Sequence, residues 1–471
     1  MSAPATTEKK YLKWYQKLAY GSGDLASNCS YGLVSSFVLL YLTGTLGLDS
    51  AIIGSLMLAS KVLDGISDVI FGTLIDRTHS KLGKARPWML FGQVGVSLCL
   101  FLLFAIPAGS TTMQYIYFFI VYTALNAVFY TANGIAYSSL VALITKNNNE
   151  RVQLGSFRFM FAVVTNIFMG FAVTGMVEKF GSGAAGWRTT ALIFAIVGLV
   201  VNTISCLAVK ELPEEELSGN TSEAAEEGKA VAEEKKHGFA ETAKILIHNK
   251  YYLMILAIYI VYYIMSNLTT GAGVFCATYY WGDGSLLGQF SMMKMFPVII
   301  ALAIAPVLIK KTGSMQKVNF WGYAISSVLG IPMIYFAMQK NLSMFLLFMF
   351  IKGIFAGTLS GSLNALIAEA SGYTTRTTGV HMDGMMYSCS SLGVKVGGGI
   401  GTAAVGWLLK LGGFVGTATV QSESAIRMIF NLYITFPFIL GIVITVLLAF
   451  LDVEKANKKW DADHAQKEAQ A

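Results

Sequence analysis

Residues 61–88 read KVLDGISDVIFGTLIDRTHSKLGKARPW. The first part of this stretch is apolar apart from Lys61, Asp64 and Asp68, which stand three and four residues apart. This spacing predicts one helix that carries all three charges on the same face. The second part, residues 74–88, is short and basic, and it predicts a hairpin that joins this helix to the next one.

The composition of the whole chain indicates a membrane protein. Of its 471 residues, 55% are apolar, 13% are charged and 47 are glycine, whereas soluble domains usually carry about 25% charged residues. A helix needs about 20 mainly apolar residues to cross a bilayer. The apolar windows predict an all-α polytopic membrane protein with twelve transmembrane helices. They lie near residues 25–46, 51–75, 88–108, 114–144, 153–177, 188–209, 251–280, 286–309, 317–338, 342–369, 385–411 and 426–451.

One long polar segment, residues 210–250, separates the first six windows from the last six. It is rich in glutamate and lysine, and its middle part is too charged to bury, so it predicts a flexible or loosely helical linker. We therefore expect five parts. They are an N-terminus at 1–20, an N-terminal six-helix bundle at 21–209, the linker at 210–250, a C-terminal six-helix bundle at 251–451 and a tail at 452–471.

Each half also contains a short sequence that is similar to one in the other half. LIDRTHSKLGKARPW at 74–88 and LIKKTGSMQKVNFW at 308–321 both follow the second apolar window of their half, as expected for parallel repeats. Basic residues gather in alternate short loops, which places both termini on the cytoplasmic side of the cell membrane. The polar, basic start lacks a short apolar region and a small-residue cleavage site, so we expect no cleaved signal peptide.

Several function classes are disfavoured by the same composition. The net charge of +7 has no dense Lys/Arg run behind it, so nucleic-acid binding is not expected. The five cysteines are scattered in apolar surroundings, which indicates buried thiols and neither a disulfide framework nor a zinc site. No arrangement of nucleophile and base appears, so we expect no enzyme and no cofactor. We expect a monomer, because nothing in the sequence indicates an oligomer.

The charges of the second window are the first candidate site. A charge in hydrocarbon costs a few kcal/mol, so a charge kept there indicates a function. Asp64 and Asp68 on one face could chelate a small cation, or could share a proton because their repulsion raises one pKa. The alternative is a structural ion pair in which Lys61 neutralises one carboxylate.

Basic residues in other windows are the second group of candidates. Arg158 and Lys395 have no obvious partner on their own helices, so their partners are expected on other helices. Each could donate hydrogen bonds to a substrate or bridge to a carboxylate across a cavity, or each could be part of a packing ion pair. Gly397–Gly399 would allow close helix approach beside Lys395. For Lys294 and Lys352, as for the lysine of the second window, the sequence does not separate a functional role from a structural one.

Amides, hydroxyls and an aromatic ring form the third group. Asp24 and Asn28 open the first window at a spacing of four, and Thr131, Tyr137 and Ser138 lie in the fourth window. Such groups suit a polar, hydroxylated ligand, and Tyr137 could stack on a sugar face. Ordinary hydrogen bonding between helices explains each of them equally well.

The chain resembles the glycoside-pentoside-hexuronide:cation symporters, the melibiose permease-like branch of the major facilitator superfamily, from about residue 20 to 451. The most specific match is residues 61–88, which are similar to the family's D-x-x-x-D followed by G-x-x-x-D-R and G-K-x-R-P-W/F. Further support comes from YGSGDLASN at 20–28, from ERVQLGSFRFMFA at 150–162 and from the lysine of the eleventh window.

The resemblance implies the major facilitator fold, with a sugar site between two six-helix bundles and a cation site on helices two and four. It implies that Asp64, Asp68 and Thr131 bind the coupling cation, which is a metal site if the cation is Na⁺. It implies that the sugar cavity includes Asn28, Arg158 and Lys395, beside the neighbouring Asp24, Tyr137 and Ser138. Gly134 and Ser138 depart from the family's sugar aspartate and aromatic residue, which implies a substrate other than melibiose, or one that is held differently.

The expected function is therefore symport of a sugar or glycoside with Na⁺, Li⁺ or H⁺ by alternating access, in contact with membrane lipid. Two alternatives remain at this point. One is a carrier of another amphiphile such as a lysolipid, because carriers of that kind share the fold. The other is a polytopic receptor that transports nothing. The sequence leaves the identity of the sugar and of the cation open.

Overall fold

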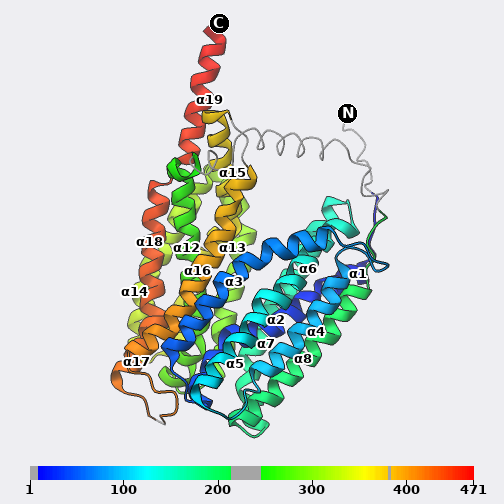
Figure 1. The fold of residues 1–471 in the computed structure, drawn as a ribbon. Helices are drawn as coiled ribbons and strands as arrows, with labels where there is room; N and C mark the ends of the chain where they lie inside the picture. Colours follow the sequence, from blue (N-terminus) through cyan, green and yellow to red (C-terminus); the bar gives the residue numbers. More distant parts are fainter. Residues whose placement is uncertain (1–8, 214–244, 380–382, 419, 471) are drawn as a thin grey trace. The chain divides into compact units, whose positions relative to one another are not determined.

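The computed structural model describes residues 9–213, 245–379, 383–418 and 420–470. Within these ranges the chain forms helices and short connections, and none of the described residues lies in a strand (Figure 1). The helices of the first half are α1 (Trp14–Gly21), α2 (Gly23–Leu40), α3 (Ser50–Asp76), α4 (Arg86–Leu103), α5 (Thr111–Thr123), α6 (Thr131–Ile144), α7 (Asn148–Lys179) and α8 (Gly183–Leu207). Those of the second half are α12 (Lys250–Phe275), α13 (Leu286–Thr312), α14 (Met315–Met338), α15 (Leu342–Thr378), α16 (Asp383–Leu411), α17 (Glu423–Phe430), α18 (Phe436–Phe450) and α19 (Val453–Gln470).

Among the residues that the structure describes, four π-helical turns extend or join these helices: Tyr41–Thr45, Ala124–Tyr130, Cys276–Tyr280 and Asn431–Thr435. In the described part of the chain, 11 helical segments are long and apolar enough to cross a membrane. α3 is not one of the 11; it has 27 residues and carries Lys61, Asp64 and Asp68 within a mainly apolar sequence. With α3 added, the described helices agree with the predicted twelve transmembrane helices.

The outward faces of these helices are apolar. On α4, the side chains of Phe91, Val94 and Leu98 are 72%, 51% and 57% exposed. Their spacing places them on one face of the helix. A broad exposed apolar surface of this kind indicates a lipid environment, in which helices satisfy their own backbone hydrogen bonds. The chain is a multi-pass membrane protein.

Short polar residues begin several of the helices. A side-chain oxygen at the residue before the helix accepts a hydrogen bond from a backbone N–H of the first turn, which otherwise has no partner within the helix. These residues are Asp49, Ser110, Asn147, Ser314 and Asn341. These residues therefore favour a helix start at the positions that follow them.

The predicted basic hairpin connects α3 to α4 and is held by its own motif residues. The Trp88 indole donates a hydrogen bond to the Thr78 hydroxyl (2.7 Å), which closes the hairpin. Arg86 is buried, and its Nε donates to the carbonyl oxygen of Cys206 at the end of α8 (3.2 Å). The R-P-W part of the motif therefore packs the hairpin against the last helix of its half.

Glu211, which follows the end of α8, is the main partner of this hairpin. Its carboxylate accepts hydrogen bonds from the backbone N–H groups of Lys84 (2.7 Å), Ala85 (2.9 Å) and Arg86 (3.1 Å). The chain can approach this closely because Gly83 has a φ of 114°, and a Cβ atom there would collide with the Glu211 side chain. The carboxylate also suits the positive end of the α4 dipole.

The second half repeats this arrangement. Glu454, just beyond α18, accepts hydrogen bonds from the Ser314 hydroxyl and from the backbone N–H of Gln316 (3.0 Å), at the start of α14. The acid after the sixth span thus caps the third span, and the acid after the twelfth span caps the ninth. This equivalence supports the prediction, made from the two similar sequences at 74–88 and 308–321, that the chain has two related halves.

We expect Glu211→Ala to lower the stability of the folded protein by about 1–3 kcal/mol, because three backbone N–H groups lose an acceptor. Thermal unfolding of the purified protein in detergent measures the effect. Glu454→Ala should cause a similar loss, whereas Glu178→Ala, at an exposed site near the end of α7, should cause little. A melting temperature of Glu211→Ala equal to that of Glu178→Ala would contradict this role.

The described chain forms two compact units. The first comprises Met1–Gly219, Gly273–Gln289 and Val405–Ile426, and the second comprises Asn220–Ala272, Phe290–Ala404 and Arg427–Ala471. The expected division into bundles at 21–209 and 251–451 stays a prediction. Most of the expected linker, residues 214–244, lies outside the described residues.

In the first unit, α2 packs against α7 and α8, α4 packs against α6 and α8, and α3 packs against α5 and α6. The start of α3 also contacts the end of α16, which belongs to the same unit. The Lys410 ammonium lies 2.6 Å from the Asp49 carboxylate, and the Ser50 hydroxyl donates to the carbonyl oxygen of Gly406 (2.9 Å). Burial by itself raises the pKa of Asp49, yet hydrogen bonds from Lys410, Ala51 and Ile52 hold that pKa below its usual range.

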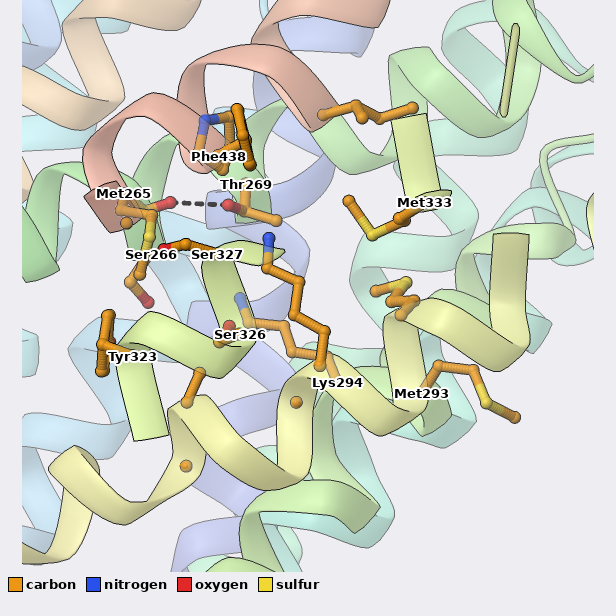
Figure 2. Close-up of a pocket in the computed structure, with 18 of the residues that line it drawn as sticks. Met265, Ser266, Thr269, Met293, Lys294, Tyr323, Ser326, Ser327, Met333 and Phe438 are labelled. Carbon is orange, nitrogen blue, oxygen red and sulfur yellow. Dashed lines mark hydrogen bonds between the residues drawn. The ribbon is translucent and has the colours of Figure 1, made fainter. Parts of the chain in front are cut away.

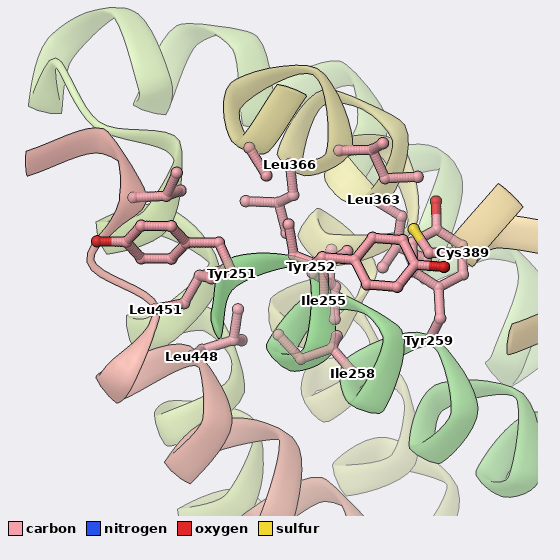
Figure 3. Close-up of a cluster of buried hydrophobic side chains, with 14 of the residues drawn as sticks. Tyr251, Tyr252, Ile255, Ile258, Tyr259, Leu363, Leu366, Cys389, Leu448 and Leu451 are labelled. Atoms are coloured by element: carbon pink, nitrogen blue, oxygen red, sulfur yellow. The ribbon is translucent and has the colours of Figure 1, made fainter. Parts of the chain in front are cut away.

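The second unit has its own core, built from α12, α15, α16 and α18. Tyr251, Ile255 and Ile258 of α12 lie against Leu366 of α15 and Leu448 of α18 in Figure 3, and all five are almost fully buried. α14 packs along α15 and also contacts α18. The second unit therefore holds together through side chains of its own helices.

Candidate functional site

The acidic helix α3 meets the fourth span at its middle. The Thr131 hydroxyl lies 2.7 Å from Oδ1 of Asp64 and 2.9 Å from the carbonyl oxygen of Asn126. Asn126 belongs to the π-helical turn Ala124–Tyr130, which precedes α6 and places this carbonyl five residues before Thr131. π-helical turns occur often at functional sites. The structure thus brings together two of the three predicted cation ligands and adds a backbone oxygen.

The other oxygen of Asp64 is occupied by the lysine of the same helix. Nζ of Lys61 lies 3.3 Å from Oδ2 of Asp64, and the two side chains are 21% and 14% exposed. The predicted pairing at a spacing of three is therefore present. Asp68 lies one further turn along α3 and is partly buried. Its part in a cation site stays a prediction.

These oxygen atoms can hold a small cation. The Thr131 hydroxyl lies within hydrogen-bonding distance of both the Asp64 carboxylate and the Asn126 carbonyl, so three oxygens of different kinds lie close together. Carboxylate, hydroxyl and carbonyl oxygens are the ligands that hard cations prefer. The described residues contain no cluster of three or more His, Cys, Asp or Glu side chains that would form a metal site of another kind.

Predicted residues from the second and third groups, Arg158, Asp24 and Asn28, meet between α2 and α7. Nε of Arg158 donates to Oδ2 of Asp24 (2.6 Å), and the side chains are 25% and 17% exposed. The partner of Arg158 is therefore on another helix, as predicted. The Asn28 amide donates to the backbone oxygen of Asp24 (2.7 Å) and accepts a hydrogen bond from Asn166 (2.9 Å). These groups form a polar cluster inside the first unit.

Tyr137 lies beneath this cluster. The Arg158 guanidinium lies 4.2 Å from the centre of the Tyr137 ring, a cation–π distance. The Tyr137 ring is also 4.7 Å from that of Tyr20, and the two residues donate their hydroxyls to each other's backbone oxygens. Tyr137 is 3% exposed. It supports Arg158 in this structure, and its stacking on a sugar stays a prediction.

The two remaining candidates lie apart from this cluster. Ser138, beside Tyr137 on α6, is exposed. Lys395 belongs to α16 in the second unit, where it is partly buried. Near it, the Gly397 backbone approaches α12 so closely that a Cβ atom would lie 2.5 Å from the carbonyl oxygen of Ile260. This confirms the close helix approach expected there, while the substrate roles of Ser138 and Lys395 stay predictions.

Three residues of these clusters were not predicted. Asn166 stands eight residues after Arg158, a spacing that places both on one face of α7, so helical periodicity could have indicated it. Tyr20 had no comparable signal, because its position under Tyr137 depends on packing between distant segments. The Asn126 carbonyl had none either, because a π-helical turn is not visible in residue types.

The chain is similar to known transport proteins over most of its length. Residues 19–455 match the family described as MFS/sugar transport protein. The chain is 26% identical to the isoprimeverose transporter of Lactiplantibacillus pentosus, over 100% of this chain and 96% of that protein. It is 24% identical to a putative glycoside/cation symporter of Escherichia coli (strain K12), over 95% of this chain and 93% of that one. Its fold is similar to that of a crystallised D-xylose-proton symporter, with a TM-score of 0.62 at 11% identity, over 94% of this chain and 98% of the other.

Proposed function

This chain belongs to the family of MFS/sugar transport proteins, and on that premise we propose that it moves a sugar or glycoside across the membrane together with a cation. The observation that carries this proposal is the oxygen cluster of Asp64, Thr131 and Asn126 inside two membrane-spanning segments. The relatives named as an isoprimeverose transporter and as a putative glycoside/cation symporter support the same substrate class.

The cation step uses the charge balance on α3. Asp64 is paired with Lys61, and Asp68 lies one turn away on the same face. A cation that binds between Asp64, Thr131 and the Asn126 carbonyl, with Asp68 beside them, reduces the net negative charge of the carboxylates. A proton on one of the carboxylates has the same effect on charge. Binding then changes the relative stability of the conformations in which the site is loaded or empty, which couples the cation to alternating access.

The sugar step uses the polar cluster on α2 and α7. Asp24, Asn28 and Arg158 offer charged and neutral donors and acceptors that match sugar hydroxyls. Tyr137, Ser138 and Lys395 complete the proposed set of sugar-binding residues. Gly134 leaves space on α6, since a Cβ atom there would meet nothing within 4 Å. We therefore propose a sugar larger than, or held differently from, one that needs an acid at that position.

Other parts of the proposal concern setting and chemistry. We propose that the protein lies in the cell membrane with both termini cytoplasmic, which the distribution of Lys and Arg in the short loops supports. The carrier needs no cofactor besides its coupling cation, catalyses no reaction and works as a monomer.

Counterflow in proteoliposomes tests this function. Vesicles that contain the purified protein are loaded with an unlabelled glycoside, diluted, and given a trace of the same labelled compound. Transient accumulation of the label is expected for at least one member of a panel of glycosides, pentoses and uronides. Counterflow of a labelled lysolipid, without counterflow of any sugar, would show that the substrate is an amphiphile. If the folded protein gives no counterflow of any compound, the result would contradict transport and favour a receptor.

A further inference from the structure

A cavity inside the second unit holds two lysines that the proposed transport mechanism does not use. Lys294 of α13 and Lys352 of α15 line it together with residues of α12, α14 and α18, and every lining residue belongs to the second unit. The cavity has a volume of about 180 Å³, whereas one water needs roughly 10–15 Å³ of such space. It therefore has room for a small ion together with water.

The cavity presents several hydrogen-bond donors that no described residue accepts from. Nζ of Lys294 donates to the Thr270 hydroxyl (3.1 Å), which uses one of the three N–H groups of an ammonium. Lys352 makes no hydrogen bond or ion pair with a described residue. The hydroxyls of Ser266 and Ser326 also donate to none of the described residues, and Figure 2 draws both serines around the same space as Lys294. A ligand in this cavity would meet mainly donors, so it must be an acceptor.

The helices around the cavity supply no negative charge to balance the two lysines. No Asp or Glu is among the described lining residues, and α12, α13, α14 and α18 contain neither residue type. Glu369 of α15 stands 17 residues after Lys352, which is about 25 Å along a helix, and its carboxylate accepts a hydrogen bond from Asn457 (2.8 Å). Lys61 and Arg158 of the first half differ, because each has its own carboxylate partner. Since unpaired charges within a membrane are costly, a bound anion would stabilise this part of the fold.

The kind of donor in this cavity favours a small spherical anion. The two lysines are single-point donors on different helices, and no arginine is among the described lining residues, so the forked pair of N–H groups that suits a carboxylate or phosphate is missing. A doubly charged oxyanion would also cost more to dehydrate, because the cost of burying an ion increases with the square of its charge. Met293 and Met333 form part of the remaining wall. A halide ion accepts hydrogen bonds from any direction and tolerates such apolar neighbours.

We propose that this cavity binds one small monovalent anion of the halide class, with Lys294 and Lys352 as its cationic ligands. The anion accepts charge-assisted hydrogen bonds from the two ammonium groups and weaker ones from the Ser266 and Ser326 hydroxyls. It offsets positive charge inside the second unit and connects α13 to α15. It is a resident structural ion and not a substrate, so the inference is independent of which sugar the first unit binds.

Equilibrium binding of radioactive chloride to the purified full-length protein in detergent tests this site. Glutamate is the background anion and keeps the ionic strength constant, and no sugar is present. We expect a single saturable site for chloride. Lys294→Gln and Lys352→Gln should each weaken chloride binding roughly 10- to 100-fold, because each removes a charge-assisted hydrogen bond. Lys310→Gln, at an exposed position near the end of α13, is the matched control and should bind chloride like the wild type.

The melting temperature of the same proteins gives a second readout as glutamate is replaced by chloride. The wild type should become more stable in a saturable way, since an ion that binds only the folded state stabilises it. Lys352→Gln should show no such rise. In chloride-free buffer this variant should melt no lower than the wild type, because it removes a charge that has no partner there. Melting of Lys352→Gln below the wild type in both buffers would show a lysine that only supports packing, and would overturn the proposal.

Two results with the wild-type protein alone would also overturn it. One is the absence of saturable chloride binding. The other is displacement of bound chloride by an equal concentration of sulfate, which would show an oxyanion site. Unchanged chloride affinity in both folded lysine variants would overturn the assignment of the ligands. Chloride binding without counterflow of any compound would keep this site and contradict transport, whereas counterflow without chloride binding would contradict the site alone.

Discussion

The double variant Asp64→Asn, Asp68→Asn is expected to lose concentrative sugar uptake and to keep exchange of sugar across the membrane. The two amides remove the negative charges that a coupling cation needs, and the polar cluster of Arg158 and Asp24 is on other helices. Accumulation in energised vesicles should fall to the level at which internal and external sugar concentrations are equal. Counterflow without a cation gradient should remain measurable.

Two controls sharpen this experiment. Glu178→Gln removes an exposed carboxylate from the same unit and should leave accumulation intact. Lys61→Gln removes the internal partner of Asp64, so we expect it to retain cation dependence while its cation affinity changes. If the double variant still accumulates sugar fully against a gradient, the result would contradict the proposal that these carboxylates bind the coupling cation.

Arg158→Ala should lower the efficiency of sugar uptake by roughly 100-fold. It removes the donor to Asp24 and the cation above the Tyr137 ring, and the loss of one partner of a buried ion pair costs about 3–5 kcal/mol. Part of that cost is recovered here because both side chains retain some exposure. Initial rates of labelled sugar uptake, normalised to the amount of inserted protein, measure the effect.

The control for Arg158 lies on the same helix. Lys179→Ala removes an exposed cation at the end of α7 and should change the rate little. If Arg158 only supports packing, the double variant Asp24→Asn, Arg158→Gln should restore normal transport, because no uncompensated charge remains. A substrate role predicts that this double variant stays inactive although it inserts and folds. Normal transport by correctly inserted Arg158→Ala would contradict both roles.

The sequence was most informative where a signal lies within one helix. Lys61 and Asp64 form a pair because they are three residues apart, and 11 spans in the described part of the chain follow from apolar length. Asp24 as the partner of Arg158 was not predictable, since 134 residues separate them and only helix packing decides which acid is near. The basic hairpin is held by Glu211, which is 125 to 127 residues away in the sequence, and nothing within the hairpin indicates that partner.

The cavity of the second unit shows the same limit. Lys294 and Lys352 each stand out as a charge in an apolar span, but their shared cavity depends on how five helices pack. The serine and threonine residues that line it come from three different helices, α12, α14 and α15. Sequence indicates that such lysines are costly. Only the packing shows that they line the same cavity, where none of the described lining residues is an Asp or Glu.

The movement of cations that accompanies sugar tests the account most directly. Proteoliposomes without any ion gradient or membrane potential are given an inwardly directed gradient of a transported sugar. A sodium-sensitive or pH-sensitive dye inside the vesicles reports whether Na⁺ or H⁺ enters. The account predicts entry of one of these cations with the sugar, and loss of that entry in the Asp64→Asn, Asp68→Asn double variant while sugar still crosses. Entry of sugar into wild-type vesicles with no cation movement would contradict coupled symport.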